Sequence, residues 1–142
     1  MVVNAGVSGS TTASGVSRMK WVFKSKPQVV LLFLGANDGL RGLKVAESEK
    51  NLAAAIEYAQ SQKVKVVLGG LYMPPNYGKE YTEGFKKMYE DLAKKYKLTF
   101  IPFVLDKVAG DPKYNQADGI HPNEAGHKII ADNIFAVLKG AL

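Results

Sequence analysis

The sequence predicts an α/β protein in which helices cover both faces of a parallel β-sheet. Segments typical of strands alternate along the chain with segments typical of helices, which favours parallel pairing through right-handed crossovers. Residues 29–34 (VVLLFL) are apolar at every position, as expected of a strand buried between two helical layers. The 142 residues suffice for one domain with one core. We therefore expect a single domain over residues 1–142 with a three-layer α/β/α sandwich architecture.

The amino-terminal half is expected to contain two strands and two helices. Residues 1–4 have the pattern of a short strand, and a loop rich in glycine, serine and threonine connects it to the first helix. That helix ends before Pro27, because the residue preceding a proline disfavours helical geometry. After the strand at residues 29–34, apolar residues at helical spacing predict a second helix over residues 45–62.

The carboxy-terminal half repeats this alternation. Residues 64–68 and 98–103 read as strands, and a turn-rich loop at residues 73–78 precedes the helix between them. The last helix is expected to begin at about Asn123. The side chains that define the apolar faces of these two helices are Tyr81, Phe85, Met88 and Leu92 in the first, and Ile130, Ile134 and Val137 in the second.

Composition excludes several classes of protein. Hydrophobic residues make up 46% of the chain and charged residues 23%, which is ordinary for a globular domain. The absence of cysteine excludes disulfides, thiolate metal sites and a cysteine nucleophile. The net charge is +6, but the lysines are spread over several predicted helices. This spread favours a solvated basic surface over a nucleic-acid-binding stripe, and leaves open an attraction to anionic lipid or acyl substrates.

Two polar loops follow predicted strands, where binding sites of parallel sheets lie. In the loop of residues 4–12, the backbone N–H of Gly9 could donate a hydrogen bond to a developing negative charge. In the loop of residues 35–43, the amide of Asn37 could do the same, while Asp38 is expected to hold the loop. Ordinary strand-to-helix and Asx turns would explain each of these loops separately.

A third loop carries an acid and a histidine three residues apart. Asp118 and His121 can face one another if Gly119 tightens the turn between them, so that the carboxylate orients the imidazole as a general base. A turn that merely starts a helix is the alternative, and His127 is read as a surface residue of that helix. A metal site built from Asp118, His121 and Asp38 would lack the further nitrogen or sulfur ligand that zinc usually has.

Together the three loops resemble the sequence blocks of the SGNH (GDSL-like) hydrolase family. Gly9 matches the second block, residues 35–38 (GAND) match the GxND block, and residues 118–122 (DGIHP) match the DxxHP block. The match has the family's order and spacing over the whole chain. Residues 34–42 (LGANDGLRG) and 75–85 (PNYGKEYTEGF) resemble the bacterial branch of multifunctional thioesterases, lysophospholipases and arylesterases.

The resemblance implies a serine–histidine–aspartate ester hydrolase without a cofactor. His121 would be the base and Asp118 its orienting acid. Gly9, through its backbone N–H, and Asn37, through its side chain, would supply two of three oxyanion donors.

The resemblance also implies an acyl pocket and a substrate class. Met73, Pro74 and Tyr77 would line the pocket, and the substrates would be acyl esters, aryl esters, thioesters or lysophospholipids. The resemblance implies a bacterial periplasmic or secreted location. It implies neither a nucleic-acid partner nor stable membrane insertion.

The family's first block, which carries the nucleophilic serine, does not occur in the sequence, and only eight residues precede Gly9. We therefore expect an amino-terminally truncated hydrolase with little or no activity of its own and an active full-length parent. Ser8 or Ser10 could substitute only if the fold brought its hydroxyl within hydrogen-bond distance of the His121 ring.

The same gap affects the expected sheet, which would be flavodoxin-like but without its internal first strand. The strands at residues 1–4 and 29–34 would lie two spacings apart, leaving unpaired backbone and bare apolar surface. Either the first segment slides into the vacancy or another chain covers the edge, so we expect a homo-oligomer. A non-catalytic acyl- or glycan-binding protein and a self-assembling unit remain as alternatives, although the Asp118–His121 pair favours the hydrolase.

Overall fold

The computed structural model describes all residues 1–142 and contains one parallel sheet of three strands. The strands are β1 (Val29–Leu32), β2 (Lys65–Gly69) and β3 (Thr99–Ile101), and their order in the sheet is β1-β2-β3. Val30 is aligned with Val66, and Leu68 with Phe100. The strands therefore follow one another across the sheet in chain order, and both pairs are parallel, as the alternation of strands and helices predicts.

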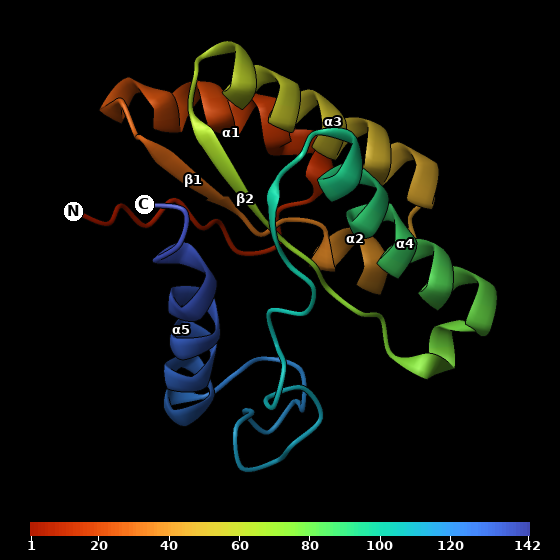
Figure 1. Cartoon of the computed structure of the whole chain (residues 1–142). Coiled ribbons are helices and arrows are strands. Elements are labelled where there is room, and N and C mark those ends of the chain that lie inside the picture. Colours follow the sequence, from red (N-terminus) through yellow and green to blue (C-terminus); the bar gives the residue numbers. More distant parts are fainter.

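Helices cover both faces of this sheet (Figure 1). The helices that precede or connect the strands pack on one face, and the last helix lies on the other (Figure 1). The α-helices are α1 (Gly15–Val22), α2 (Ala36–Leu40), α3 (Val45–Ser61), α4 (Lys79–Lys95) and α5 (Glu124–Leu138). Three short 3-10 helices accompany them: η1 (Thr12–Ser14), η2 (Phe23–Ser25) and η3 (Pro75–Tyr77). The expected three-layer α/β/α architecture is confirmed.

The main core lies between the sheet and helices α1, α3 and α4. Leu52 and Ile56 of α3 and Phe85 of α4 are completely buried there, on the faces that the sequence periodicity predicts. The other face has a smaller core of Val67, Ile101 and Val104, which α5 covers only partly. Ile130, Ile134 and Val137 of α5 pack on it but remain half-buried. None of the helices combines the length and the apolar composition that a membrane span requires.

The predicted strand at residues 1–4 is wrong. These residues form no strand, and Val2 is 93% exposed. A strand needs a neighbour that offers backbone hydrogen bonds, and no backbone hydrogen bond joins this segment to the sheet. For the same reason β1 is an edge strand, shorter than the predicted 29–34 and only half-buried at Val29–Leu31.

Each strand is preceded by a lysine in the left-handed backbone conformation. The φ angles are +52° at Lys26, +60° at Lys63 and +52° at Lys97. Lys63 and Lys97 follow the ends of α3 and α4, where a left-handed residue reverses the chain into the next strand. Glycine usually occupies such positions, because a Cβ atom is strained there.

Candidate active site

The structure brings Asp118 and His121 into direct contact in the loop before α5. The Nδ1 atom of His121 lies 2.6 Å from Oδ2 of Asp118. Oδ1 of Asp118 accepts hydrogen bonds from the backbone N–H groups of Ile120, at 2.9 Å, and of His121, at 3.0 Å. Gly119, with φ +70°, makes this tight turn possible because glycine adopts that conformation without strain. The predicted acid–histidine pair therefore forms within four residues of chain.

The turn also determines the charge of the acid. Hydrogen bonds from the backbone N–H groups of His121 and Ile120, joined by the His121 side chain, lower the pKa of Asp118 from 3.8 to about 2. The carboxylate is thus ionised at neutral pH. It accepts a hydrogen bond from the N–H at Nδ1 of His121, which leaves Nε2 as the basic nitrogen of the ring. The His121 side chain is 71% exposed, so that nitrogen is accessible.

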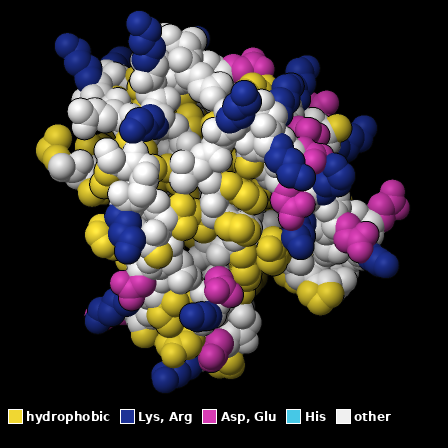
Figure 2. Space-filling model, viewed as in Figure 1, with side chains coloured by type: hydrophobic (Ala, Val, Ile, Leu, Met, Phe, Trp, Pro, Cys, Tyr) yellow, Lys and Arg dark blue, Asp and Glu magenta, His cyan; other side chains and the backbone are white.

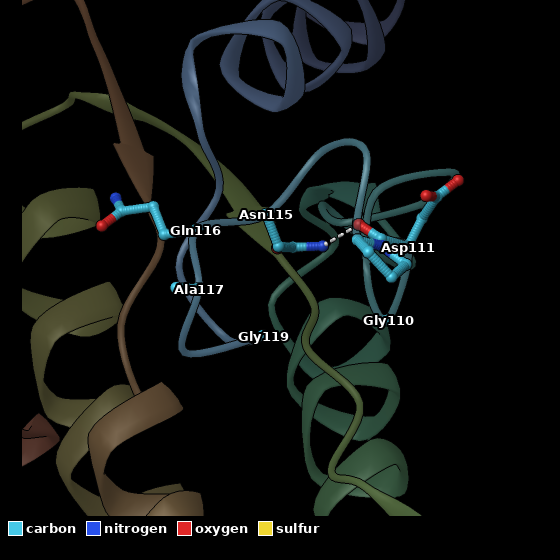
Figure 3. Close-up of a pocket in the computed structure, with 7 residues that line it drawn as sticks. Gly110, Asp111, Asn115, Gln116, Ala117 and Gly119 are labelled. Atoms are coloured by element: carbon cyan, nitrogen blue, oxygen red, sulfur yellow. Dashed lines mark hydrogen bonds between the residues drawn. The ribbon is translucent and has the colours of Figure 1, made fainter.

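Asn123 and Asn115 hold this loop in shape. Asn123 caps α5 by accepting a hydrogen bond from the N–H of Gly126 at 3.0 Å, and its Nδ2 donates to the carbonyl of Lys113 at 2.9 Å. Asn115 is only 7% exposed, and its Nδ2 donates to the carbonyl of Val108 and to that of Asp111. Figure 3 shows the bond to Asp111. Sequence reasoning missed Asn115, although asparagines in glycine- and proline-rich loops commonly bond to nearby backbone.

Backbone hydrogen bonds across the base of the Asp118–His121 loop hold its two ends together. The N–H of Gln116 donates to the carbonyl of His121 at 2.8 Å, and Asn115 forms an isolated antiparallel bridge with Pro122. A cavity of about 370 Å³ lies beside this loop and is lined by residues 110–112, 115–117 and 119 (Figure 3). The loop is thus a closed unit that presents Asp118 and His121 at its tip.

The other two loops are tied together by Asp38. This carboxylate is 2% exposed and accepts hydrogen bonds from the backbone N–H of Thr12 at 2.9 Å and from its hydroxyl. A third hydrogen bond comes from the hydroxyl of Ser48 in α3 at 2.9 Å. Asp38 therefore has the holding role that its position predicts, and it joins the segment after Gly9 to the segment that carries Asn37.

Asn37 and Gly9 are neighbours across the same junction. Nδ2 of Asn37 donates to the carbonyl of Ser10 at 3.0 Å, which leaves its second hydrogen free. Gly9 has φ +73° and is exposed, and its N–H makes no hydrogen bond while its carbonyl accepts from Arg41 at 3.0 Å. Both predicted oxyanion donors therefore retain an unused N–H.

The two pairs of residues share one edge of the sheet. Asn37 lies in α2, directly beyond the carboxyl end of β1, and the Asp118–His121 loop lies beyond the carboxyl end of β3 (Figure 1). No hydrogen bond joins the two pairs to each other. The structure thus brings together Gly9 with Asn37 and Asp118 with His121, on the side of the sheet where parallel folds bind ligands.

Neither serine of the first loop contacts the histidine. Ser8 is exposed and makes no side-chain hydrogen bond. The hydroxyl of Ser10 donates to the carbonyl of Val7 at 2.9 Å and accepts from the guanidinium of Arg18 at 2.7 Å. The Ser10 hydroxyl thus has two local partners.

Two of the three predicted acyl-pocket residues, Met73 and Tyr77, contact α2. Met73 is buried, and its side chain fills the space where a Cβ atom at Gly39 would lie, 2.2 Å from the sulfur. The Tyr77 hydroxyl donates to the carbonyl of Leu40 at 2.8 Å, and Pro74 is exposed. Met73 and Tyr77 therefore support the short helix that carries Asn37.

Tyr89 is a further supporting residue that sequence reasoning missed. It is 1% exposed, and its hydroxyl donates to the carbonyl of Leu34 at 2.9 Å. Burial raises the pKa of this phenol. The hydroxyl lies where a side chain at Gly35 would be, so Tyr89 fixes the turn between β1 and Asn37. The sequence signal for such a residue is a tyrosine on the apolar face of a helix, since a buried hydroxyl needs a hydrogen-bond partner.

No group of three potential metal-ligating side chains is present.

Comparison with known proteins adds a family and several relatives. Residues 1–129 match the model of the GDSL-like Lipase/Acylhydrolase family. The chain is 41% identical over 142 residues to Esterase TesA of Pseudomonas aeruginosa, covering 99% of this chain and 71% of that protein. It is 37% identical over 132 residues to Thioesterase 1/protease 1/lysophospholipase L1 of Escherichia coli, covering 92% of this chain and 64% of that protein.

Solved structures give the same result. The crystal structure of TesA superimposes with a TM-score of 0.95 at 40% identity, covering 100% of this chain and 79% of that one. The psychrotrophic esterase EstA from Pseudoalteromonas, inhibited by monoethylphosphonate, gives 0.92 at 31% identity, covering 98% and 76%. The esterase AlinE4, described as an SGNH-hydrolase family esterase, gives 0.79 at 39% identity, covering 100% and 77%.

Proposed function

Because the chain belongs to the GDSL-like lipase/acylhydrolase family, we propose that Asp118 and His121 are the acid and base of a carboxylic ester hydrolase. The observation that carries the proposal is the 2.6 Å contact between Nδ1 of His121 and the Asp118 carboxylate. With Nδ1 protonated, Nε2 accepts the proton of a serine hydroxyl as that serine attacks the ester carbonyl. The imidazolium then donates the proton to the leaving group, and Asp118 stabilises its charge throughout.

Gly9 and Asn37 supply the oxyanion site in this proposal. The tetrahedral intermediate carries a negative charge on the former carbonyl oxygen, and fixed N–H donors stabilise that charge. The free N–H of Gly9 and the second hydrogen of the Asn37 amide are such donors. Asp38 keeps the two segments in register through Thr12. The donors are therefore fixed before the substrate binds.

The nucleophile is proposed to come from outside these 142 residues. Support comes from the hydrogen bonds of Ser10, which are directed to Val7 and Arg18, and from the lack of any side-chain partner for Ser8. The chain spans 64% of the Escherichia coli relative and 71% of the Pseudomonas one. We expect the 142 residues alone to turn over esters slowly or not at all.

Substrates are proposed to be small acyl esters and thioesters. Relatives carry the names esterase, thioesterase, lysophospholipase and arylesterase, which share cleavage of an acyl group from oxygen or sulfur. In our proposal Met73, Pro74 and Tyr77 form the wall of the acyl pocket beside α2. Met73 is suited to this place because its flexible thioether adapts to acyl chains of different shape.

A fluorophosphonate probe tests the proposed centre. The probe should label a serine in a chain extended to the length of the relatives, and His121→Ala should abolish that labelling. The 142 residues alone should remain unlabelled. Labelling of the 142 residues that disappears in Ser10→Ala would instead make Ser10 the nucleophile and overturn this part of the proposal.

We also propose that β1 mediates association with a second copy of the chain. Support comes from the outer edge of β1, which pairs with no strand, and from Val2 and Val3, which are 93% and 50% exposed. Unpaired edges and bare apolar side chains favour pairing with another chain. Light scattering of a dilution series should show a dimer or larger species at micromolar concentration, and a monomer throughout would contradict the proposal.

A further inference from the structure

Trp21 occupies an unusual place on α1. It is the only tryptophan of the chain, and it is 62% exposed. Helix α1 buries Gly15 and Met19 on its opposite face, so Trp21 lies on the outward face, between Ser17 one turn before and Lys24 one turn after. Its indole contacts no other aromatic ring and makes no hydrogen bond. Neither an aromatic pair nor a hydrogen bond therefore explains why a tryptophan stands at this exposed position.

The charged residues near Trp21 in the sequence are all basic. The first 37 residues contain four cationic side chains and no acidic residue. Lys20, Lys24 and Lys26 are exposed and belong to no ion pair. The fourth cation, Arg18, is directed inward to Ser10 and Ala5. We name Lys20, Trp21, Lys24 and Lys26 together the Trp21 patch.

Neighbouring elements add positive charge rather than acid to this region. Lys63 and Lys65, at the start of β2, are exposed and belong to no ion pair. Figure 2 shows dark-blue Lys or Arg side chains and no magenta side chain at the upper left, where Figure 1 places η2 and the start of β1. Glu57 is an acidic residue of the neighbouring helix α3, and its carboxylate accepts a hydrogen bond from the Tyr96 hydroxyl.

From these observations we propose that the Trp21 patch docks the protein onto an anionic lipid bilayer. An indole prefers the headgroup region of a bilayer, where its ring is partly desolvated and its N–H stays wet. Lysines around it are attracted to negatively charged headgroups, at roughly a fivefold gain in affinity for each lysine near the surface. A nucleic acid duplex would use the cations, but its bases are already stacked on one another, so it gives no comparable apolar layer for a ring at the centre of the patch.

The patch and the candidate active site lie at opposite edges of the sheet. Helix α1 and η2 lead into the amino end of β1, whereas Asn37 and the Asp118–His121 loop follow the carboxyl ends of strands (Figure 1). A protein docked through Trp21 therefore keeps its active site open to the aqueous phase. Docking and ester hydrolysis are thus separable properties, and the inference does not depend on the proposed catalytic centre.

Intrinsic fluorescence tests the proposal, because Trp21 is the sole tryptophan. We expect a blue shift on adding vesicles of equal parts phosphatidylcholine and phosphatidylglycerol, and no shift with phosphatidylcholine alone. Lys20→Glu combined with Lys24→Glu should weaken vesicle binding by at least ~25-fold, as two lysines at about fivefold each require. Trp21→Ser should reduce the vesicle-bound fraction in co-sedimentation.

Lys44→Glu combined with Lys107→Glu is the matched control. Both lysines are exposed, belong to no ion pair and lie beyond the carboxyl ends of strands. The control has the same net charge as the patch variant, and it should bind vesicles within about threefold of the original chain, since those lysines lie outside the patch. If both double variants lost vesicle binding equally, the net charge alone would explain the binding, and the proposal would be overturned. Binding to duplex DNA but not to vesicles would overturn it in favour of a nucleic-acid partner.

Discussion

Asp38 accepts two hydrogen bonds from Thr12, one from its backbone N–H and one from its hydroxyl, across 26 positions of the chain. This contact fixes the loop that carries Gly9 against the helix that carries Asn37. A buried carboxylate is stable only when its oxygens are satisfied by donors. The carboxylate of Asp38 has three donors, the third being the hydroxyl of Ser48.

Asp38→Asn should therefore lower the free energy of unfolding by about 2 kcal/mol, because an amide nitrogen would face hydrogen-bond donors in a buried site. Urea denaturation of the two proteins measures the difference. Asp132→Asn is the control, since Asp132 is exposed and makes no ion pair. A similar small effect of both changes would show that the Asp38 contacts do not hold the loops together.

The low pKa of Asp118 should survive the loss of the imidazole. The backbone N–H of His121 contributes most to the lowering, followed by the N–H of Ile120, and His121→Ala retains both donors. NMR titration of the carboxyl carbon should give a pKa near 2 in the original chain and a value still below 3.8 in the variant. A return to 3.8 would mean that the side-chain contact dominates.

The same shift predicts how the pH affects stability. The pKa of Asp118 is lower in the folded chain than the ordinary value of 3.8, so its contribution is fully present above pH 3.8. That contribution is lost as the pH falls from 3.8 towards about 2. Asp118→Asn should flatten the acid limb of the stability curve in this window, as followed by urea denaturation at each pH. An unchanged acid limb would contradict the assignment.

Gly35→Ala should destabilise the protein by about 2–4 kcal/mol, since the new methyl group requires strained backbone and overpacks the turn. Gly35 has φ +120°, and an added Cβ would lie 2.3 Å from the Tyr89 hydroxyl oxygen. Gly84→Ala is the matched control, because Gly84 lies inside α4 with 3.8 Å to its nearest neighbour. Thermal unfolding should show a lower midpoint for the first variant and a raised one for the second.

Lys63→Gly should stabilise the protein by about 0.5–1 kcal/mol. Relief of the left-handed strain contributes about 1–2 kcal/mol, and the greater entropy of glycine in the unfolded chain offsets about half of it. Lys94→Gly should have the opposite effect, because Lys94 lies in the last turn of α4, where glycine weakens a helix. Urea denaturation should place the two variants on opposite sides of the original chain.

Much of this architecture could be predicted because buried strands and helices have recognisable patterns of apolar residues in the local sequence. Residues 29–34 are apolar throughout, and the stripe through Phe85 and Leu92 repeats at helical spacing. Asp118 and His121 were predictable as a pair because they lie three positions apart, and the glycine at position 119 allows a tight turn between them. The positions of Gly9 and Asn37 followed from the general rule that loops beyond strand ends converge.

The remainder depends on contacts between distant segments. Residues 1–4 have a strand-like composition but no neighbouring strand to pair with. The Tyr89 hydroxyl, which fixes the turn at Gly35, donates a hydrogen bond to Leu34, 55 residues earlier in the chain. No local sequence pattern encodes this contact. The support that Asn115 gives to the Asp118 loop likewise becomes visible only when the loop is closed.

The two histidines of the chain allow the most direct test of the proposed centre. In a chain extended to the length of the relatives, kcat/KM for p-nitrophenyl esters should fall by roughly 10³-fold or more in His121→Ala, as loss of a general base requires. His127→Ala should leave that rate nearly unchanged, because His127 is an exposed residue of α5. Equal rates in the two variants would contradict the assignment of His121 as the catalytic base.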